Sequence, residues 1–406
     1  MTTVADFERE LEGLLAETVA QAKQREATAF PAFIGPYHKR IVLFGAGQMG
    51  RRVLSVLRRD GLEPMAFADN DPSKWGTTID GIMVLDPTEA ARRFGAEGAF
   101  IVTIWGAFSK DRMGARIAQL RALGCTTVET FESLSWHYAA DLMPHYGLDS
   151  PHKVLAQADV VRQVLSLWSD DASRQEYLSQ LRWRLYGDFE GLGDPVAHPI
   201  YFPPDVLTLQ ADEVFVDCGA FDGDTIKLFN RQTQGRFRKA IGFEPDPANF
   251  ARLVAALSAT DGLTPPRVEV RCCATGARSE KLQFVADGSL GSHVSNAPGP
   301  GVIEVDCVAL DDALPPDVAT FIKMDIEGAE LDALAGARRT IGAFSPVLAI
   351  SAYHAQDHLW RVPSLIHELN ADYDFYLRPH DNEMWDLVCY AVPRSRSARR
   401  QIRSSD

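Results

Sequence analysis

The chain of 406 residues carries 41 Lys and Arg against 55 Asp and Glu, a formal net charge of −14, and 46% of its residues are hydrophobic. This acidic balance argues against nonspecific binding to nucleic acid or to an anionic membrane. The length predicts two or three domains that each bury a core, and no apolar run is long enough to span a bilayer.

The start of the chain and the cysteines indicate the compartment. Residues 1–6 show no basic segment followed by an apolar core, so we expect no signal peptide. The six cysteines form no Cys-x-x-Cys pair, and several lie in apolar runs. We therefore expect buried free thiols in a cytoplasmic protein.

The first third of the chain alternates strand and helix patterns after an amphipathic helix predicted at residues 6–28. We expect strands at 41–44, 65–68, 100–104 and 127–130, and helices at 49–59 and 112–123. Such alternation is typical of a parallel sheet wrapped by helices, which predicts a Rossmann-like domain over residues 1–140.

A glycine loop, Gly45-Ala46-Gly47-Gln48-Met49-Gly50, follows the first of these strands and opens a helix. This G-x-G-x-x-G pattern contains no acid and precedes Arg51 and Arg52, which suits a phosphate at a helix N-terminus. The loop resembles that of the nucleotide-binding domain preceding some sugar-modifying enzymes. The resemblance implies a nucleotide or nucleotide-sugar site at Gly45, Gly47, Gly50 and Asp69, where Asp69 ends the second strand. The alternative is a packing loop in a domain without a ligand.

The segment 141–205 is predicted to be a helical linker or cover. Helices are expected at 154–168 and 173–186, and the stretch 187–204 is rich in Gly, Pro and aromatic residues. Within that stretch, Tyr201-Phe202-Pro203-Pro204 either covers a ligand or packs as a linker.

From residue 213 the alternation resumes and predicts a second α/β domain over residues 206–393. We expect strands at 214–216, 240–243, 268–271, 321–324 and 347–351, helices near 224–231, 247–258, 328–342 and 359–370, and an irregular β-rich stretch over 281–310. Two further strands, 374–378 and 387–392, are joined by a short polar loop, which predicts a hairpin whose last strand runs antiparallel. A parallel sheet completed in this way has the class I methyltransferase architecture. Residues 394–406 form a short basic tail.

The turn after the first strand of this domain is crowded with acids. Asp217, Asp222 and Asp224 lie around Gly219 and Gly223. Glycine lets the backbone approach a ligand closely, whereas three carboxylates would repel a pyrophosphate. S-adenosylmethionine, which carries an ammonium and a sulfonium, therefore suits this turn better than a dinucleotide.

Further polar residues follow the later strands of the same domain. Glu244 ends the second strand, Asp325 and Glu327 follow the fourth, and His354 follows the fifth. Because ligands of open α/β sheets bind at the carboxyl ends of the strands, these side chains together predict one site. Any one of them alone would be explained as well by helix capping.

Three sequence blocks together resemble the FkbM-type S-adenosylmethionine-dependent methyltransferases: residues 217–225, Phe243-Glu244-Pro245, and Met324-Asp325-Ile326-Glu327-Gly328-Ala329-Glu330. The resemblance covers roughly residues 200–393 and implies methyl transfer to a hydroxyl of a sugar, glycan or secondary metabolite. It also implies ribose contact at Glu244 and adenine near Cys273 and Ala274. The full set of implied cofactor residues is Asp217, Gly219, Ala220, Phe221, Asp222, Gly223, Thr225, Glu244, Cys273, Ala274 and Asp325.

An aliphatic hydroxyl is a poor nucleophile, so we expect a general base beside the acceptor. His354 is the first candidate because a free imidazole has a pKa near neutrality, and Asp325 or Glu327 is the rival. His354 could equally bond a backbone carbonyl at the strand end. Carboxylates and His354 could also gather around a divalent metal ion, but no ligand spacing identifies one. The stretch 289–300, rich in Gly, Ser and Pro, is either an acceptor loop or a surface connection.

Two other functions stay open at this point. The chain could be an NAD(P)-dependent oxidoreductase that uses the loop Gly45 to Gly50, although no Tyr-x-x-x-Lys pair occurs near residues 45–130. It could also be a binding protein whose methyltransferase fold no longer catalyses, although the acids at the strand ends argue against this. The sequence names neither the acceptor nor an oligomeric state, and a homo-oligomer stays open.

Overall fold

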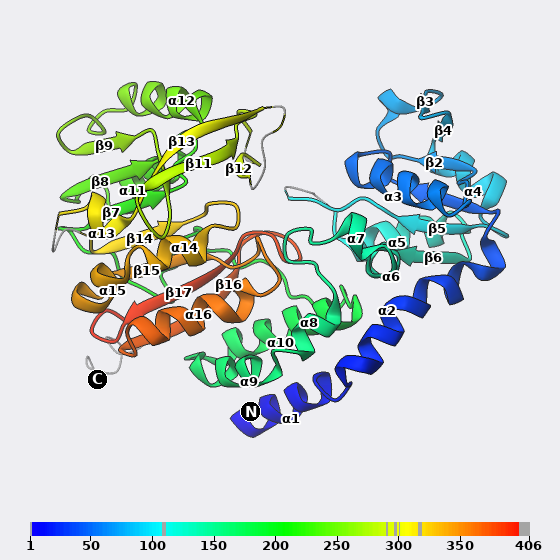
Figure 1. Ribbon diagram of the computed structural model, residues 1–406, viewed down its shortest axis with the longest axis horizontal. Coiled ribbons are helices and arrows are strands. Elements are labelled where there is room, and N and C mark those ends of the chain that lie inside the picture. Colours follow the sequence, from blue (N-terminus) through cyan, green and yellow to red (C-terminus); the bar gives the residue numbers. More distant parts are fainter. Residues whose placement is uncertain are drawn as a thin grey trace. The chain divides into compact units, whose positions relative to one another are not determined.

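The computed structural model describes residues 2–107, 111–289, 291–295, 299, 301–315 and 319–397. The chain divides into two compact units. Unit 1 comprises Met1–Asp159, Glu176–Pro195 and Asp381–Trp385, and unit 2 comprises Val160–Gln175, Val196–His380 and Asp386–Asp406. Both units combine helices with a parallel-rich sheet, so the predicted α/β fold class is confirmed (Figure 1).

The units do not follow the predicted boundaries at residues 140 and 205, because the segment between them forms no unit of its own. The division runs through helix α10 (Asp171–Tyr186). In unit 2, Ser173 Oγ accepts a hydrogen bond of 3.0 Å from the Leu377 amide. In unit 1, the fully buried Trp183 ring lies 5.6 Å from the Trp105 ring. A sequence pattern shows that a helix has apolar positions, but not which sheet they pack against.

Unit 1 is built around a six-stranded sheet of order β3-β4-β2-β1-β5-β6. Its strands are β1 (Ile41–Phe44), β2 (Ala66–Ala68), β3 (Thr78–Ile79), β4 (Ile82–Leu85), β5 (Ala99–Val102) and β6 (Thr127–Thr130). All neighbouring strands are parallel except β3 and β4. Every residue of β1 and β5 is buried, as expected for central strands covered on both faces.

The helices of unit 1 follow the predicted alternation with one difference at the start of the chain. They are α1 (Val4–Leu14), α2 (Val19–Ile34), α3 (Gln48–Arg59), α4 (Pro87–Phe94), α5 (Met113–Ala122), α6 (Glu132–His137), α7 (Ala139–Leu142) and α8 (Pro151–Leu155), with short 3₁₀ turns η1 (Gly35–Tyr37) and η2 (Pro72–Lys74). The single helix predicted at 6–28 is wrong. Thr18 and Gln21 form a capping box that starts a second helix, in which the Thr18 amide donates to Gln21 Oε1 over 2.8 Å.

Unit 2 contains a seven-stranded sheet of order β16-β17-β15-β14-β7-β8-β9. Its strands are β7 (Val214–Cys218), β8 (Lys239–Phe243), β9 (Val268–Arg271), β14 (Phe321–Met324), β15 (Val347–Ser351), β16 (Tyr373–Pro379) and β17 (Leu387–Pro393). Strands β9, β8, β7, β14 and β15 run parallel to one another, whereas β17 is antiparallel to both β15 and β16. The predicted closing hairpin is therefore confirmed.

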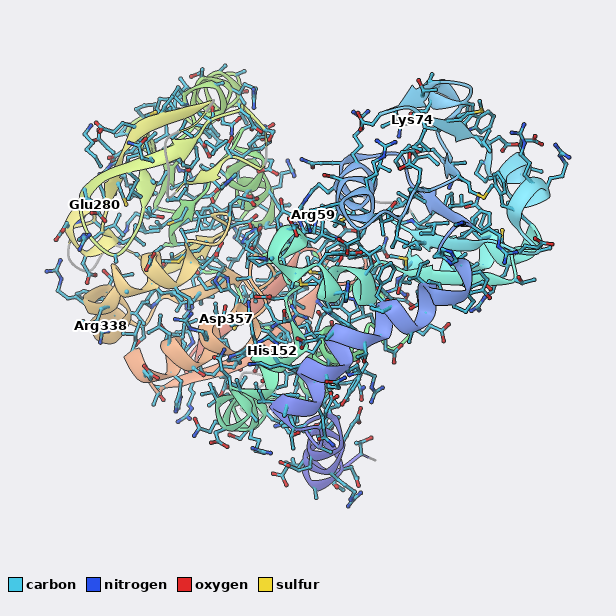
Figure 2. The ribbon with its side chains drawn as sticks, turned by 45° about the vertical axis from the view of Figure 1, so that its right-hand side comes forward. Arg59, Lys74, His152, Glu280, Arg338 and Asp357 are labelled. Carbon is cyan, nitrogen blue, oxygen red and sulfur yellow. The ribbon has the colours of Figure 1, made fainter. Side chains whose placement is uncertain are left out.

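The β-rich stretch predicted at 281–310 forms most of a second, four-stranded sheet in unit 2, of order β10-β13-β11-β12. Its strands are β10 (Ala274–Thr275), β11 (Glu280–Val285), β12 (His293–Val294) and β13 (Val302–Val308). Figure 2 marks Glu280 at the start of β11. The remaining helices are α9 (Ala158–Leu167), α11 (Asp224–Gln232), α12 (Pro247–Ser258), α13 (Leu310–Ala313), α14 (Glu330–Ala335), α15 (Arg338–Phe344) and α16 (His358–Leu369). Helix α16 runs alongside β17 (Figure 1).

The predicted basic tail begins as an ordered part of unit 2. Arg396 forms an ion pair with the buried Glu213, and Tyr376 Oη lies 2.8 Å from Ser397 Oγ. Residues 398–406 lie outside the described part of the chain. The start of this segment packs against the sheet because its arginine neutralises a buried carboxylate.

Two findings bear on the expectations about thiols and membranes. All six cysteines are free, and Cys272 is exposed while the other five are buried. None of the helices that the structure describes has both the length and the apolar composition needed to cross a membrane.

In both large sheets, the strand order reverses beside the first strand. The neighbours at this point are β1 and β5 in unit 1, and β7 and β14 in unit 2. Connections that leave two such strands diverge to opposite faces and open a crevice at the carboxyl ends. Both glycine turns found in the sequence begin at these points, since Gly45 follows β1 and Gly219 follows β7.

Candidate active site

A pocket in unit 2 lies where β7, β8, β9 and β14 end. It is lined by Gly219, Phe221, Phe243, Glu244, Pro245, Asn249, Cys273, Ala274, Thr275, Phe284, Ser289, Ser292, Val294, Ile326 and Ala329. Five of the residues predicted to contact the cofactor are in this set: Gly219, Phe221, Glu244, Cys273 and Ala274. The structure thus brings together three segments that are far apart in the sequence.

The pocket is narrow, with a free volume of about 60 Å³. Pockets for small molecules usually measure roughly 300–1,000 Å³. Part of the wall comes from Ser289 and Ser292, on the stretch that was predicted as a possible acceptor loop; its residues 290, 296–298 and 300 lie outside the described residues. Ser292 Oγ donates to Asp246 Oδ2 over 2.9 Å, which ties this wall to the start of helix α12. A ligand of adenosine size therefore requires some of the lining groups to move.

Gly219 is a glycine because the ends of two strands meet there. Its φ is +79°, and a Cβ at this position would lie 2.0 Å from the Asp325 carbonyl oxygen. The amides of Gly219 and Ala220 both donate to the Phe243 carbonyl oxygen over 3.0 Å. The turn is thus held between β14 on one side and β8 on the other. It therefore cannot shift to make room for a methyl group at position 219.

Replacing Gly219 by Ala should destabilise the protein by more than the roughly 1–2 kcal/mol that a left-handed backbone alone costs a residue with a Cβ. Gly262 is the matched control, because its φ is +78° but a Cβ there would meet nothing closer than 3.8 Å. Urea unfolding of Gly219→Ala and Gly262→Ala measures the difference. Equal losses in the two variants would show that the close approach of Asp325 is unimportant.

Glu244 connects the pocket to the glycine turn. Its carboxylate accepts a hydrogen bond of 3.0 Å from the Phe221 amide and one of 2.9 Å from the Asp246 amide. The side chain is buried, and burial raises its pKa to about 6. Phe221 has a φ of +46°, a strained value for a residue with a Cβ. Glu244 therefore holds this turn in place and presents its remaining acceptor capacity to the pocket.

Asp217 and Lys323 form a buried ion pair beneath the glycine turn. Lys323 Nζ lies 3.0 Å from Asp217 Oδ1 and donates to the Gly219 carbonyl oxygen over 2.7 Å. Burial raises the pKa of Asp217 to about 6, against the opposing effect of Lys323. Burial alone would lower the pKa of Lys323, but the carboxylates of Asp217 and Asp325 outweigh it and raise that pKa. The pair supports the turn from below.

Six residues predicted to contact the cofactor lie outside the lining of this pocket: Asp217, Ala220, Asp222, Gly223, Thr225 and Asp325. Ala220 is buried in the core, and Gly223, with a φ of +83°, caps helix α11. Asp222 accepts a hydrogen bond of 3.1 Å from the Asp224 amide. These residues shape the turn, and their contact with a cofactor stays a prediction.

His354 lies among three carboxylates at the ends of β14 and β15. Its Nδ1 is 2.7 Å from Glu330 Oε1, and its Nε2 is 3.3 Å from Asp325 Oδ1 and 3.7 Å from Glu327 Oε1. Burial alone would lower the pKa of His354, but the three carboxylates outweigh it and raise the pKa to about 10. At neutral pH the ring is therefore an imidazolium. The reason for expecting His354 as the base, a pKa near neutrality, does not hold in this environment.

The two acids that follow β14 differ in their protonation. Burial would raise the pKa of Asp325, but Lys323 and His354 hold it below its usual range. Burial raises the pKa of Glu327 to about 7, and 22% of its side chain is exposed. Glu327 also has a φ of +54°, and such strained residues gather at functional sites. Of the three predicted candidates, Glu327 has the pKa best matched to proton acceptance near neutral pH.

Asp325, Glu330 and His354 each offer a ligand atom within 4.8 Å of the others, a set that a divalent cation could use. A cation there would have to displace the proton of His354 and open its hydrogen bond to Glu330. The ion pairs with the imidazolium account for the arrangement, so we assign no metal to it.

Sequence reasoning underrated two residues of this site and missed Lys323. Tyr201 was expected only in a segment that either covers a ligand or packs as a linker, and in the structure it is 4% exposed and donates to Asp325 Oδ2 over 2.8 Å. Glu330 was named only as part of the third sequence block, without a role, and its carboxylate lies 2.7 Å from His354 Nδ1. The signal for Lys323 was a lone charge inside the apolar strand Phe321–Met324, since a buried charge needs a partner.

Comparison with known proteins agrees with this geometry. Residues 217–387 match the family described as Methyltransferase FkbM domain, and no curated protein matches the chain. The crystal structure of methyltransferase FkbM from Methylobacillus flagellatus KT is similar over 96% of this chain and 100% of that chain, with a TM-score of 0.76 and 23% identity. Two further solved structures are much less similar to this chain. UDP-D-quinovosamine 4-dehydrogenase from Vibrio fischeri (24% identity, 23% of this chain and 75% of that chain) has a TM-score of 0.19. Precorrin-6y C5,15-methyltransferase from Geobacter metallireducens GS-15 (14% identity, 46% of this chain and 81% of that chain) has a TM-score of 0.28. These two similarities carry no weight here.

The family match assigns a methyltransferase domain to residues 217–387, and the similarity to the solved structure shows the mixed α/β fold. Residues 217–387 form an FkbM methyltransferase domain, which confirms the family resemblance seen in the sequence.

Proposed function

We propose that the protein transfers the methyl group of S-adenosylmethionine to a hydroxyl oxygen of a sugar, glycan or other secondary metabolite. The charge of the unit 2 pocket carries this proposal. Among the described residues that line it, Glu244 is the only Asp or Glu and none is Lys or Arg, and the buried pair of Asp217 and Lys323 beneath the turn adds no net charge. Such a site favours the ammonium and sulfonium of S-adenosylmethionine and disfavours a pyrophosphate.

The residues around the pocket fit the two ends of such a cofactor. Gly219 and Phe221 would surround the methionine part, and Glu244 would accept hydrogen bonds from ribose hydroxyls. Cys273, Ala274 and Phe284 offer an apolar surface for the adenine ring. When bound, the cofactor supplies a methyl group on a positively charged sulfur.

Methyl transfer itself asks for alignment and for removal of one proton. The acceptor oxygen must face the methyl carbon at about 3 Å, in line with the bond that breaks. Glu327 would take the hydroxyl proton as the acceptor oxygen bonds to the methyl carbon, and the bound cofactor would supply that methyl group together with a neutral thioether as the leaving group. His354, held by Glu330, stays charged and fixes Asp325 and Glu327 through its Nε2 side. Tyr201 restrains Asp325 from the other side.

Calorimetry with S-adenosylmethionine tests the proposed cofactor. We expect binding to the wild-type protein, and binding weaker by about tenfold or more in Glu244→Gln, because hydrogen bonds to a charged group contribute roughly 1.5–3 kcal/mol. Glu304→Gln, which removes an exposed acid on β13, should bind like the wild type. If the wild-type protein does not bind S-adenosylmethionine, the proposed function fails.

A further inference from the structure

Unit 1 contains a second cavity, which methyl transfer does not use. Its volume is about 630 Å³, within the roughly 300–1,000 Å³ of ligand pockets. It lies where the strand order reverses, since Gly45 follows β1 and Thr103 follows β5. This is the place where open α/β sheets bind ligands.

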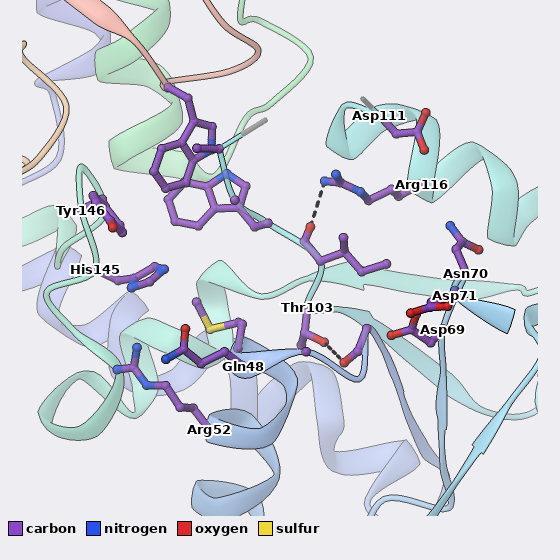
Figure 3. A pocket seen from close by; sticks show the side chains of 18 of the residues that line it. Gln48, Arg52, Asp69, Asn70, Asp71, Thr103, Asp111, Arg116, His145 and Tyr146 are labelled. Atoms are coloured by element: carbon purple, nitrogen blue, oxygen red, sulfur yellow. Dashed lines mark hydrogen bonds between the residues drawn. The ribbon is translucent and has the colours of Figure 1, made fainter. Parts of the chain in front are cut away.

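The cavity has two different ends. In Figure 3, Asp69, Asn70 and Asp71 lie on one side, His145 and Tyr146 lie on the opposite side, and the glycine loop lies between them. The second end is aromatic, because the ring of Trp385 lies 4.9 Å from that of Tyr146 and 5.1 Å from that of Trp105. Burial lowers the pKa of His145 to about 4, so the ring of His145 carries no charge at neutral pH. The cavity therefore suits an elongated ligand with a stacking ring at one end and polar groups at the other.

Packing explains two of the three glycines in the loop. A Cβ on Gly50 would lie 2.0 Å from the Gly45 carbonyl oxygen, and one on Gly45 would lie 2.6 Å from Ile104 Cγ1. Gly47 is different, because its φ is −90° and a Cβ there would meet nothing within 4 Å. Gly47 lines the cavity, so the space that its side chain would take is open to a ligand.

The open space at Gly47 lies at the start of helix α3. Gly47 is the N-cap of this helix and makes no side-chain capping bond. The amides of the first turn therefore face the space in front of Gly47, where the positive end of a helix dipole attracts an anion. Helix α3 has 12 residues, which is long enough for this effect to be substantial.

Asp69 holds the glycine loop and a nearby cation. Its Oδ2 accepts hydrogen bonds from the Ala46 amide at 2.7 Å and from Lys74 Nζ at 3.0 Å, and its Oδ1 accepts from the Asp71 amide at 2.8 Å. Three of about four acceptor positions on this carboxylate are thus in use. Lys74, marked in Figure 2, lines the cavity together with Arg52 and Arg116. These three cations balance the three lining carboxylates, whereas the unit 2 pocket has no cation in its described lining.

We propose that unit 1 binds a nucleoside diphosphate, with its diphosphate against Gly47 at the start of α3 and its base or sugar against the aromatic end. A nucleoside diphosphate sugar and a dinucleotide both contain this group. The proposal concerns a ligand other than the methyl donor, and it holds or fails independently of the function proposed for unit 2.

Calorimetry on the full-length protein with ADP, UDP, UDP-glucose, NAD and inorganic pyrophosphate tests this proposal. We expect at least one of the four nucleotides to bind more tightly than pyrophosphate. Tighter binding of UDP-glucose than of UDP and NAD would identify a nucleotide-sugar, and tightest binding of NAD a dinucleotide. The proposal is overturned if no nucleotide binds at millimolar concentration, or if pyrophosphate binds as tightly as all of them, since that would mean an anion site only.

The variant Gly47→Ala locates the site. Its methyl group enters open space in the structure, so the fold should persist while the affinity for the bound nucleotide falls by roughly tenfold or more, because backbone can no longer approach the diphosphate closely. Gly13→Ala is the matched control, since a Cβ on Gly13 in α1 also meets nothing within 4 Å and Gly13 does not line the cavity. Thermal unfolding and S-adenosylmethionine binding should be retained in both variants. Unchanged nucleotide affinity in a folded Gly47→Ala protein would refute the proposed position.

Discussion

Replacing Glu327 by Gln should lower the methyl-transfer rate by roughly 10²–10⁴-fold at neutral pH, the usual contribution of a general base. The substitution keeps the size of the side chain but removes its ability to take a proton. Because Glu327 does not line the cofactor pocket, the affinity for S-adenosylmethionine should change little. The rate is measured as S-adenosylhomocysteine released with the best acceptor from a panel of hexoses and nucleotide-sugars, and the affinity by calorimetry.

The pH profile separates Glu327 from its rivals. The pKa of Glu327 is about 7, and only its ionised form accepts a proton, so the wild-type rate should rise as the pH increases through about 7. His354, with a pKa of about 10, would instead give a rate that still rises well above neutral pH if it acted as the base. Glu304→Gln serves as the control and should keep both the rate and the profile. A Glu327→Gln protein with the wild-type rate would exclude Glu327 and return the role to Asp325 or His354.

Replacing Lys323 by Met should destabilise unit 2 by about 3–5 kcal/mol, because it leaves the carboxylate of Asp217 buried without its partner. The double variant Asp217→Asn/Lys323→Met removes the stranded charge and should recover much of this loss. Urea unfolding measures both. Lys281→Met provides the control: Lys281 pairs with Asp306 over 2.7 Å on an exposed face, and its loss should cost less than about 1 kcal/mol.

The pH dependence of this effect has a definite sign. Asp217 has a folded pKa of about 6, above its ordinary value, and loss of Lys323 should raise it further. A group with a raised folded pKa gives stability that is present at low pH and lost as the pH rises through that pKa. The difference between Lys323→Met and wild type should therefore shrink toward about pH 4. A difference that grows on acidification would contradict the assignment of Asp217 as the stranded charge.

Much of the fold could be predicted because its signals are local. Short apolar runs alternating with helical patterns predicted β1 to the residue, β8 within one residue and β7 within two, and the polar turn between two apolar runs predicted the hairpin of β16 and β17. Gly219 and Glu244 were found because they directly follow strands, and strands of a parallel sheet end at one edge, whereas Cys273 came from the family resemblance.

The charge states of the site could not be predicted in this way. The pKa of His354 depends on Glu330, 24 residues away, and the position of Asp325 depends on Tyr201, 124 residues away. Coulomb energies depend on distances in space, and burial in a medium of low polarity multiplies them. A histidine at the end of a strand looks the same in sequence whether zero or three carboxylates surround it.

The sequence by itself determined the alternation of elements, the two glycine turns and their opposite charge, and the family to which residues 217–387 belong. These properties depend on residues that are close in the sequence, because backbone conformation and the amphipathic period are set by local chemistry. Only the tertiary structure decided that Lys323 neutralises Asp217, that His354 carries a proton, and that Gly47 borders open space where Gly45 and Gly50 do not. Each of these depends on what another segment of the chain places beside the residue, and packing, not sequence distance, sets that contact.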